Sequence, residues 1–161
     1  MPNCTNHLIK LPLQTIIMKV ILDTNFLIYC TKEKIDYVEK LGEMLHEKFN
    51  IVVPLIVIDE LKKIMQKQKR FIPFAQRTAR FRKTTGRDKE AAKLALAILE
   101  KHVREGAAHT IVVKGKTVDE ALITLAQEDK KNIVCTLDKE MRSILGRVIL
   151  MNKNKQLILT R

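Results

Sequence analysis

Short apolar runs of strand length alternate with helical patterns along this chain of 161 residues. The runs are continuously apolar, without the regular polar interruptions of a half-exposed strand, which is typical of strands buried on both faces of a parallel sheet. We expect strands at residues 20–22, 50–53, 110–113, 132–136 and 148–151. Because parallel neighbours need a crossover helix between them, the sequence predicts an α/β fold: a doubly wound parallel sheet of 4–5 strands with helices on both faces.

Helical patterns fill the intervals between these strands. Residues 34–48 carry apolar side chains on one stripe, as an amphipathic helix does. Pro54 suits a first helical turn, where its missing N–H costs nothing, and Thr117 forms a Thr-x-x-Glu capping box with Glu120. We expect helices that start at residues 24 and 117 and others at 34–48, 54–66, 88–104 and 138–145, a loop with a short helix at 71–81 and an edge strand at 156–160.

The first 17 residues stand apart from this pattern. They contain two prolines and only a short apolar run, so they form a poor signal peptide and are too short for a membrane span. We interpret 1–17 as a flexible extension or a misassigned start, and 18–161 as one domain. The three cysteines, Cys4, Cys30 and Cys135, include no Cys-x-x-Cys pair. This favours a reducing, cytoplasmic setting over a disulfide framework or a zinc knuckle.

Positive charge is concentrated in two regions of the chain. The net charge is +12, with ten Lys or Arg and no acid between residues 61 and 87, and five more without an acid between 141 and 161. A basic surface of this kind suits a polyanion such as RNA, although a proteome of generally basic proteins would produce it too. The chain has no Trp and two Tyr, which argues against binding on a platform of stacked aromatic residues.

Four acids occupy corresponding points of the expected sheet. Asp23 follows the first strand directly, and Asp138 follows the fourth by two residues. Glu60 and Asp119 lie in helices that come after strands, and helical phase puts each beside its apolar stripe, whereas their neighbours Asp59 and Glu120 point to solvent. We therefore expect Glu60 and Asp119 to be half-buried, which is costly for a carboxylate unless it is paired or bound to a metal.

Each acid also has a purely structural interpretation. Asp23 and Asp138 suit the N-cap of a helix, Asp119 suits the positive end of a helix dipole, and Glu60 suits an ion pair with Lys63 or Lys67. Four such acids together with a basic surface are harder to explain in this way. Because the carboxyl ends of parallel strands meet at one edge, the four acids are expected to converge there.

Four segments, in order, resemble the four motifs of PIN-domain nucleases. They are Val-Ile-Leu-Asp-Thr-Asn at 20–25, Val-Ile-Asp-Glu-Leu-Lys-Lys-Ile at 57–64, Val-Asp-Glu-Ala-Leu at 118–122 and Val-Cys-Thr-Leu-Asp-Lys-Glu at 134–140. Their order and spacing match over about residues 18–152, nearly the whole chain. The sequence resembles in particular the archaeal VapC-type and ribosomal-RNA-processing PIN nucleases, whose basic tail is similar to residues 152–155 here.

This resemblance implies a metal-dependent endoribonuclease that leaves a 5′-phosphate. Asp23, Glu60, Asp119 and Asp138 would hold Mg²⁺ or Mn²⁺, hard cations that prefer oxygen ligands. Thr136 would orient the ligand or a metal-bound water, Asn25 would brace Asp23, and Asp129 and Glu140 are spare acids. The expected RNA-binding residues are Arg70, Arg77, Arg80, Arg82, Lys153 and Lys155.

Two other classes of protein fit these residues less well. A phosphoacceptor receiver domain needs paired early acids and a lysine at the last strand, whereas here Asp23 stands alone and Val148-Ile-Leu has no such lysine. A phosphatase of the Asp-x-Asp type is excluded by Asp23-Thr24-Asn25. A non-catalytic RNA-binding or ribosome-assembly module on the same fold stays open. Within the enzyme class, a toxin with a small antitoxin partner and an RNA-processing factor both stay open, as does a homodimer by analogy with the family; no membrane partner is expected.

Overall fold

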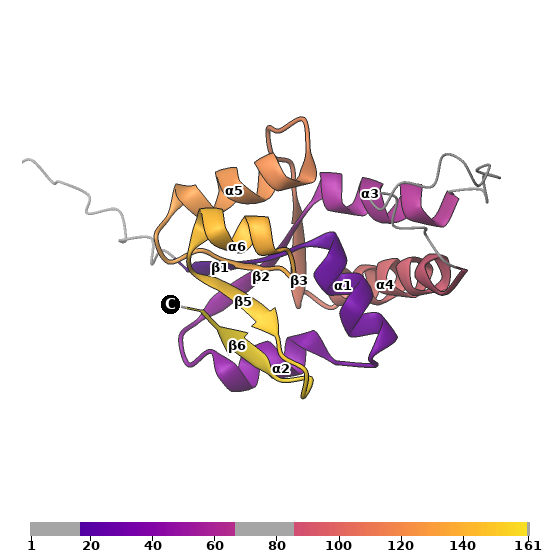
Figure 1. Cartoon of the computed structure of the whole chain (residues 1–161), viewed down its shortest axis with the longest axis horizontal. Helices are drawn as coiled ribbons and strands as arrows, with labels where there is room; N and C mark the ends of the chain where they lie inside the picture. Colours follow the sequence, from indigo (N-terminus) through magenta and orange to yellow (C-terminus); the bar gives the residue numbers. More distant parts are fainter. Residues whose placement is uncertain (1–16, 67–85, 161) are drawn as a thin grey trace, which may run out of the picture.

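The computed structural model describes residues 17–66 and 86–160, which form one six-stranded sheet with helices packed around it (Figure 1). The strands are β1 (Met18–Leu22), β2 (Phe49–Pro54), β3 (Ala108–Ile111), β4 (Ile133–Cys135), β5 (Val148–Met151) and β6 (Leu157–Leu159). The helices are α1 (Thr24–Lys32), α2 (Tyr37–Met44), α3 (Leu55–Gln66), α4 (Gly86–Arg104), α5 (Val118–Glu128) and α6 (Lys139–Leu145).

The strand order in the sheet is β3-β2-β1-β4-β5-β6. The first five strands run parallel, and β6 is antiparallel to β5, so the predicted parallel sheet and its edge strand are both confirmed. Along the chain, β2 and β3 are added on one side of β1, and β4, β5 and β6 are added on its other side, so the order of the strands reverses at β1. In open parallel sheets such a reversal leaves a crevice at the carboxyl ends of the strands, which is where ligands bind.

The core is built on β1. Val20, Ile21 and Leu22 are fully buried, because helices cover both faces of the sheet. In Figure 1, α5 and α6 lie together above the sheet and α2 lies below it. Helix α5 packs on β1 and β4, and α1, α3 and α4 pack against one another beside it. This double covering explains why residues 20–22 had to be apolar.

The amphipathic helix expected at 34–48 is present, but it is shorter at both ends and covers Tyr37–Met44. The helix begins only at Tyr37, because the Asp36 carboxylate accepts hydrogen bonds from the backbone N–H groups of Val38 and Glu39 and so caps it. Lys34 has a positive φ of 55°, which interrupts the chain between α1 and α2. At the other end Leu45 has extended backbone, so the helix stops at Met44. The apolar stripe marked the buried face correctly but not the helix ends.

The third strand lies two residues earlier than the predicted 110–113. Pairing with β2 begins at Ala108, which is fully buried, and ends at Ile111, whereas Val112 is 83% exposed. β3 is an edge strand with one neighbour, and Val112 lies beyond the end of its pairing with β2, so the apolar side chain of Val112 is not covered. The predicted loop at 71–81 and the extension at 1–16 lie outside the described residues. None of the described helices is long and apolar enough to cross a membrane.

Candidate active site

Asp23 stands at the carboxyl end of β1, where the strand passes into α1. Its backbone N–H donates to the carbonyl of Cys135 at 3.1 Å, which extends the pairing of β1 with β4. The side chain is 4% exposed, yet it makes no capping hydrogen bond to α1. Asp23 therefore occupies the N-cap position, but capping does not account for its buried carboxylate, which is costly unless it is paired or bound to a metal.

Burial raises the pKa of Asp23 to about 6. The hydroxyl of Thr136 and the backbone N–H of Thr24 lower this pKa, while the neighbouring carboxylates of Glu60 and Asp119 raise it further. A carboxylate in such surroundings gains most from a bound cation, because the positive charge offsets both the lost hydration and the repulsion.

Thr136 holds Asp23 in place from the neighbouring strand. Its hydroxyl donates to Asp23 Oδ2 at 2.8 Å and accepts the backbone N–H of Asp138 at 3.1 Å. Because Thr136 is fully buried and its hydroxyl has both partners, it acts on the two acids. Its two hydrogen bonds show a positioning role for Thr136, and the predicted contact with ligand or metal-bound water stays a prediction.

Glu60 reaches the site from α3 and is held by Thr24. The Thr24 hydroxyl donates to Glu60 Oε2 at 2.5 Å, and Glu60 is half-buried, as helical phase predicted. Within the described part of the chain Glu60 forms no ion pair with a lysine. Sequence reasoning missed Thr24, although its place directly after Asp23 in the first motif was a signal that it belongs to the site.

Asp119 and Asp138 come from the starts of α5 and α6. Asp119 is exposed, so the expected half-burial is wrong: helical phase gives only the side of the helix, and burial depends on what packs against that side. Partial burial of the carboxylate nevertheless raises its pKa, and Asp138, Glu60 and Glu140 add to this. Asp138 does cap its helix, accepting the N–H groups of Glu140 and Met141 at 2.6 and 3.3 Å, both through Oδ1; its second oxygen is not used by the cap.

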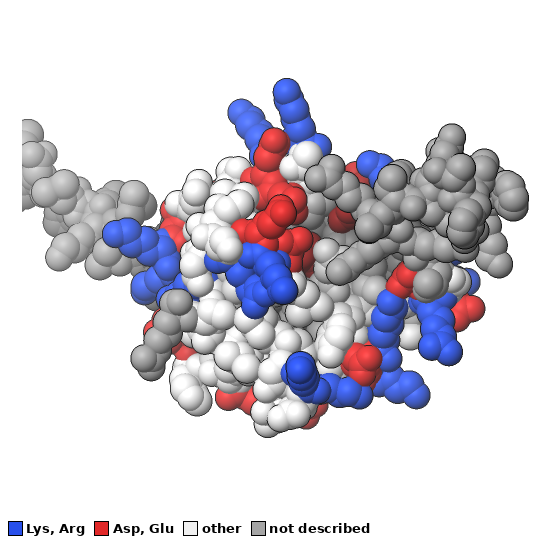
Figure 2. Space-filling model, in the orientation of Figure 1, with Lys and Arg blue, Asp and Glu red and all other residues white. Residues whose placement is uncertain are grey.

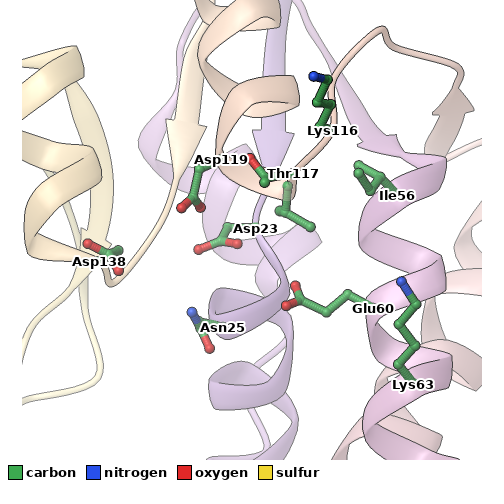
Figure 3. A pocket seen from close by; sticks show the side chains of 10 residues that line it. Asp23, Asn25, Ile56, Glu60, Lys63, Lys116, Thr117, Asp119 and Asp138 are labelled. Carbon is green, nitrogen blue, oxygen red and sulfur yellow. The ribbon is translucent and has the colours of Figure 1, made fainter. Parts of the chain in front are cut away.

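All four acids line one pocket of about 410 Å³ at the carboxyl edge of the sheet (Figure 3). Figure 3 shows Asp23 and Asp119 in the middle of this space, with Glu60 on one side and Asp138 on the other. Asn25 is exposed and also lines the pocket, but no hydrogen bond joins it to Asp23, so the predicted brace is wrong. The other lining residues are Ile56, Lys63, Lys116, Thr117 and Val118.

The donor chemistry of this pocket fits a hard divalent cation, since its acidic groups are all carboxylates. As the side chains stand, no three His, Cys, Asp or Glu of the described residues form a ready-made metal site. A closed cage is not required for Mg²⁺, which keeps several waters and binds through one or two carboxylates. The four acids therefore form a convergent but open set of oxygen ligands.

Basic side chains border the acids. Figure 2 shows a cluster of red carboxylates with blue side chains above and below it. Lys63 and Lys116 line the pocket itself, which sequence reasoning missed. Lys153 lines a second hollow nearby, and Lys155 pairs with Glu33 at 2.7 Å. The predicted RNA contacts Arg70, Arg77, Arg80 and Arg82 lie outside the described residues.

The two spare acids separate. Asp129 accepts the backbone N–H of Lys131 at 2.8 Å in the turn between α5 and β4, at the opposite edge of the sheet from the pocket. Glu140 lies in the first turn of α6 and is close enough to raise the pKa of Asp119. Only Glu140 is thus a neighbour of the four acids.

Comparisons with known proteins agree with this architecture. The family described as "PIN like domain" matches residues 20–155. Ribonuclease VapC4 of Methanocaldococcus jannaschii is 30% identical over 127 residues, which cover 79% of this chain and 82% of that protein. The solved structure of the PIN domain endonuclease Utp24 is similar with a TM-score of 0.61 at 21% identity, over 88% of this chain and 90% of its own. The VapBC2 complex from Rickettsia felis, bound to a promoter DNA fragment, is similar with a TM-score of 0.44 at 19% identity, over 84% and 98%.

The family match spans both described parts of the chain and includes all four acids. The likeness to Utp24 shows that the fold is shared. Together with the identity to VapC4 over most of both chains, these findings confirm the predicted resemblance: the chain belongs to the PIN-domain family and is a relative of the VapC-type ribonucleases.

Proposed function

We propose that this protein is a metal-dependent endoribonuclease that hydrolyses RNA phosphodiester bonds. The observation that carries the proposal is the convergence of Asp23, Glu60, Asp119 and Asp138 on one open pocket from four separate segments of the chain. The relative VapC4 is named a ribonuclease, which supports RNA as the substrate.

The four carboxylates would hold Mg²⁺ or Mn²⁺. When bound, such an ion lowers the pKa of a coordinated water and stabilises charge on the leaving oxygen. The chain's own residues orient the carboxylates that would bind this ion. Thr136 and Thr24 keep the carboxylates of Asp23 and Glu60 in fixed orientations, which preserves the geometry that a shared ion needs.

The lysines solve an electrostatic problem, because a set of acids alone repels an RNA phosphate. Lys63 and Lys116 line the same pocket as the acids, so they can attract phosphate groups of the strand beside the one being cleaved. We retain Arg70, Arg77, Arg80, Arg82 and Lys153 as further predicted RNA contacts. Lys155 is a weaker candidate, since its ammonium group is already paired with Glu33.

Cleavage of a labelled RNA with Mn²⁺, with and without EDTA, tests the proposal. We expect Asp23→Asn and Asp119→Asn each to lower the rate at least about a hundredfold, because loss of a ligand collapses the metal site. Glu60→Gln should do the same, whereas Asp59→Asn, the exposed neighbour on the same helix, serves as matched control and should keep the wild-type rate. Cleavage that survives in EDTA and in both Asp variants would refute the assignment.

The alternative is a non-catalytic RNA-binding or ribosome-assembly module, which would use the basic side chains at the pocket without a metal. RNA binding in EDTA that is unchanged by Mn²⁺, without cleavage at any metal concentration, would establish this alternative instead.

The biological role is proposed at the level of two candidates, a VapC-type toxin and an RNA-processing enzyme. The kinship with VapC4 favours the toxin, with a small antitoxin protein encoded beside it as partner. Overexpression in a host cell should then arrest growth, and co-expression of that neighbour should relieve the arrest. The predicted homodimer and cytoplasmic setting remain predictions, the latter supported by the buried free thiols of Cys30 and Cys135.

A further inference from the structure

A second hollow of about 300 Å³ lies beside the acids, and we propose that it binds one nucleotide of the RNA strand next to the cleaved phosphate. This inference rests on the proposed function. The size is at the lower end of the range of about 300 to 1,000 Å³ that small-molecule sites occupy. The residues that carry the argument are Tyr29, Leu137, Arg142, Met151 and Lys153, all of which line the hollow.

The second hollow and the acidic pocket are lined by neighbouring residues of the chain. Leu137 and Asp138 are consecutive residues after β4, yet Leu137 lines the second hollow and Asp138 lines the acidic pocket. Lys153 follows β5, the next parallel strand, and so belongs to the same carboxyl edge of the sheet. A strand whose phosphate meets the acids can therefore place its neighbouring nucleotide in the second hollow.

Two cations in this hollow have no acidic partner. Arg142 is half-buried, and its Nε donates to the backbone carbonyl of Asp138 at 3.3 Å, which keeps the guanidinium along α6. Neither Arg142 nor Lys153 forms an ion pair with any residue of 17–66 or 86–160. Lys155, two residues further along the same turn, is paired with Glu33 instead. Arg142 and Lys153 are therefore not engaged by a described carboxylate and suit a phosphate.

The turn that carries Lys153 is firmly built. Asn152 Oδ1 accepts the backbone N–H groups of both Asn154 and Gln156 at 2.9 Å. This oxygen therefore closes the turn between β5 and β6, while the Asn152 side chain also lines the hollow. Its role is to present Lys153 at the rim of the hollow.

Apart from Asn152, the rest of the lining is largely apolar. Tyr29 of α1 is half-buried, and Leu137 and Met151 lie around it. A flat apolar wall beside two cations matches a ligand that joins a flat ring to an anion, which is the chemistry of a nucleotide. Inorganic phosphate alone would make no use of the apolar wall. A tyrosine ring can stack on any base, so the subsite is expected to tolerate every sequence.

The test measures binding of a fluorescein-labelled single-stranded RNA octamer to the full chain in EDTA, by fluorescence anisotropy over a range of salt. Arg142→Ala and Lys153→Ala should each raise Kd about tenfold. Each should also reduce the slope of log K against log salt by about 0.7, the value of one phosphate contact on a single strand. Tyr29→Leu should raise Kd about fivefold or more without changing that slope, while Tyr29→Phe should keep the wild-type Kd because its ring still stacks.

An exposed lysine provides the matched control. Lys130→Ala removes a charge at the opposite edge of the sheet. It should change Kd by less than about twofold, since an isolated surface charge contributes little. Equal melting temperatures by circular dichroism establish that the variants are folded. If Tyr29→Leu is not folded, Tyr29→Phe still shows whether the hydroxyl of Tyr29 contributes, and the Arg142 and Lys153 variants still test the site.

The outcomes separate this inference from the proposed function. If wild type cleaves RNA with Mn²⁺ but Kd is the same in the Arg142, Lys153 and Tyr29 variants, the subsite is wrong and the nuclease stands. If the variants behave as expected but wild type never cleaves, the nuclease is wrong and the subsite stands as an RNA site. Dependence on the two cations without dependence on Tyr29 would overturn the nucleotide assignment. Binding of free adenosine monophosphate without binding of the octamer would overturn the claim that the nucleotide belongs to an RNA strand.

Discussion

The Thr24 hydroxyl donates a hydrogen bond to Glu60 Oε2 at 2.5 Å, and so ties the first residue of α1 to the middle of α3. Thr24 is 2% exposed, while Glu60 is half-buried and faces the pocket. The hydrogen bond therefore fixes one oxygen of the carboxylate from the protein side and limits how the group can turn toward the pocket.

Replacing Thr24 by Val removes this donor at nearly constant volume. We expect RNA cleavage to fall about tenfold, as is typical when the support of a metal-binding side chain is lost. Thr24→Ser keeps the hydroxyl and should stay within about threefold of wild type. The rates are measured under saturating Mn²⁺, and the idea fails if Val and Ser have equal rates in folded protein.

Asp23 is predicted to lower the stability of the metal-free protein. Its pKa rises from 3.8 to about 6 because burial disfavours the charged form. Between these two pH values the folded state holds more protons than the unfolded state, so stability falls as pH rises through this window and then levels off. The full loss is about 3 kcal/mol at most.

Asp23→Asn should therefore stabilise the protein at pH 7.5 in EDTA while removing activity. The gain should be about 1 to 3 kcal/mol at pH 7.5 and much smaller at pH 4, where Asp23 is already mostly protonated. Urea unfolding at the two pH values provides the measurement. A wild type and a variant whose free energies of unfolding change in parallel with pH would contradict the buried-charge explanation.

Thr136→Val is expected to move the pH profile of cleavage. The Thr136 hydroxyl lowers the pKa of Asp23, so its loss should raise that pKa and shift the acidic limb of the profile toward higher pH by about one unit, the equivalent of one hydrogen bond. Thr136→Ser should restore the wild-type profile. A drop in rate at every pH without a shift would mean that Thr136 only supports the fold.

Asn132 is predicted to be a structural residue outside the pocket. It is 7% exposed, its Nδ2 donates to the carbonyl of Leu125 at 2.9 Å, and its Oδ1 accepts the N–H of Lys19 at 3.1 Å. Asn132→Ala leaves both backbone groups unsatisfied and should cost about 2 to 3 kcal/mol. Exposed Asn154→Ala should cost less than about 0.5 kcal/mol. Chemical unfolding of the two variants side by side checks the difference.

Local sequence was enough to predict the sheet and the edge of the sheet at which the four acids meet. A run such as Val20, Ile21 and Leu22 has to be buried on both faces, because no polar position is present to face water. Since parallel strands end at a common edge, the acids that follow them were expected to meet there, and all four line one pocket. These conclusions depend on residue type and order alone, which is why they could be drawn without coordinates.

Contacts between distant segments decided the rest. The hydrogen bond from Thr136 to Asp23 joins residues 113 positions apart, and the bond from Thr24 to Glu60 joins residues 36 apart. Helical phase gave the correct burial for Glu60 but not for Asp119, because phase describes one helix and burial depends on what packs against it. The apolar hollow beside Arg142 arises where α1, α6 and the end of β5 meet, so only the packing of those three elements could reveal it.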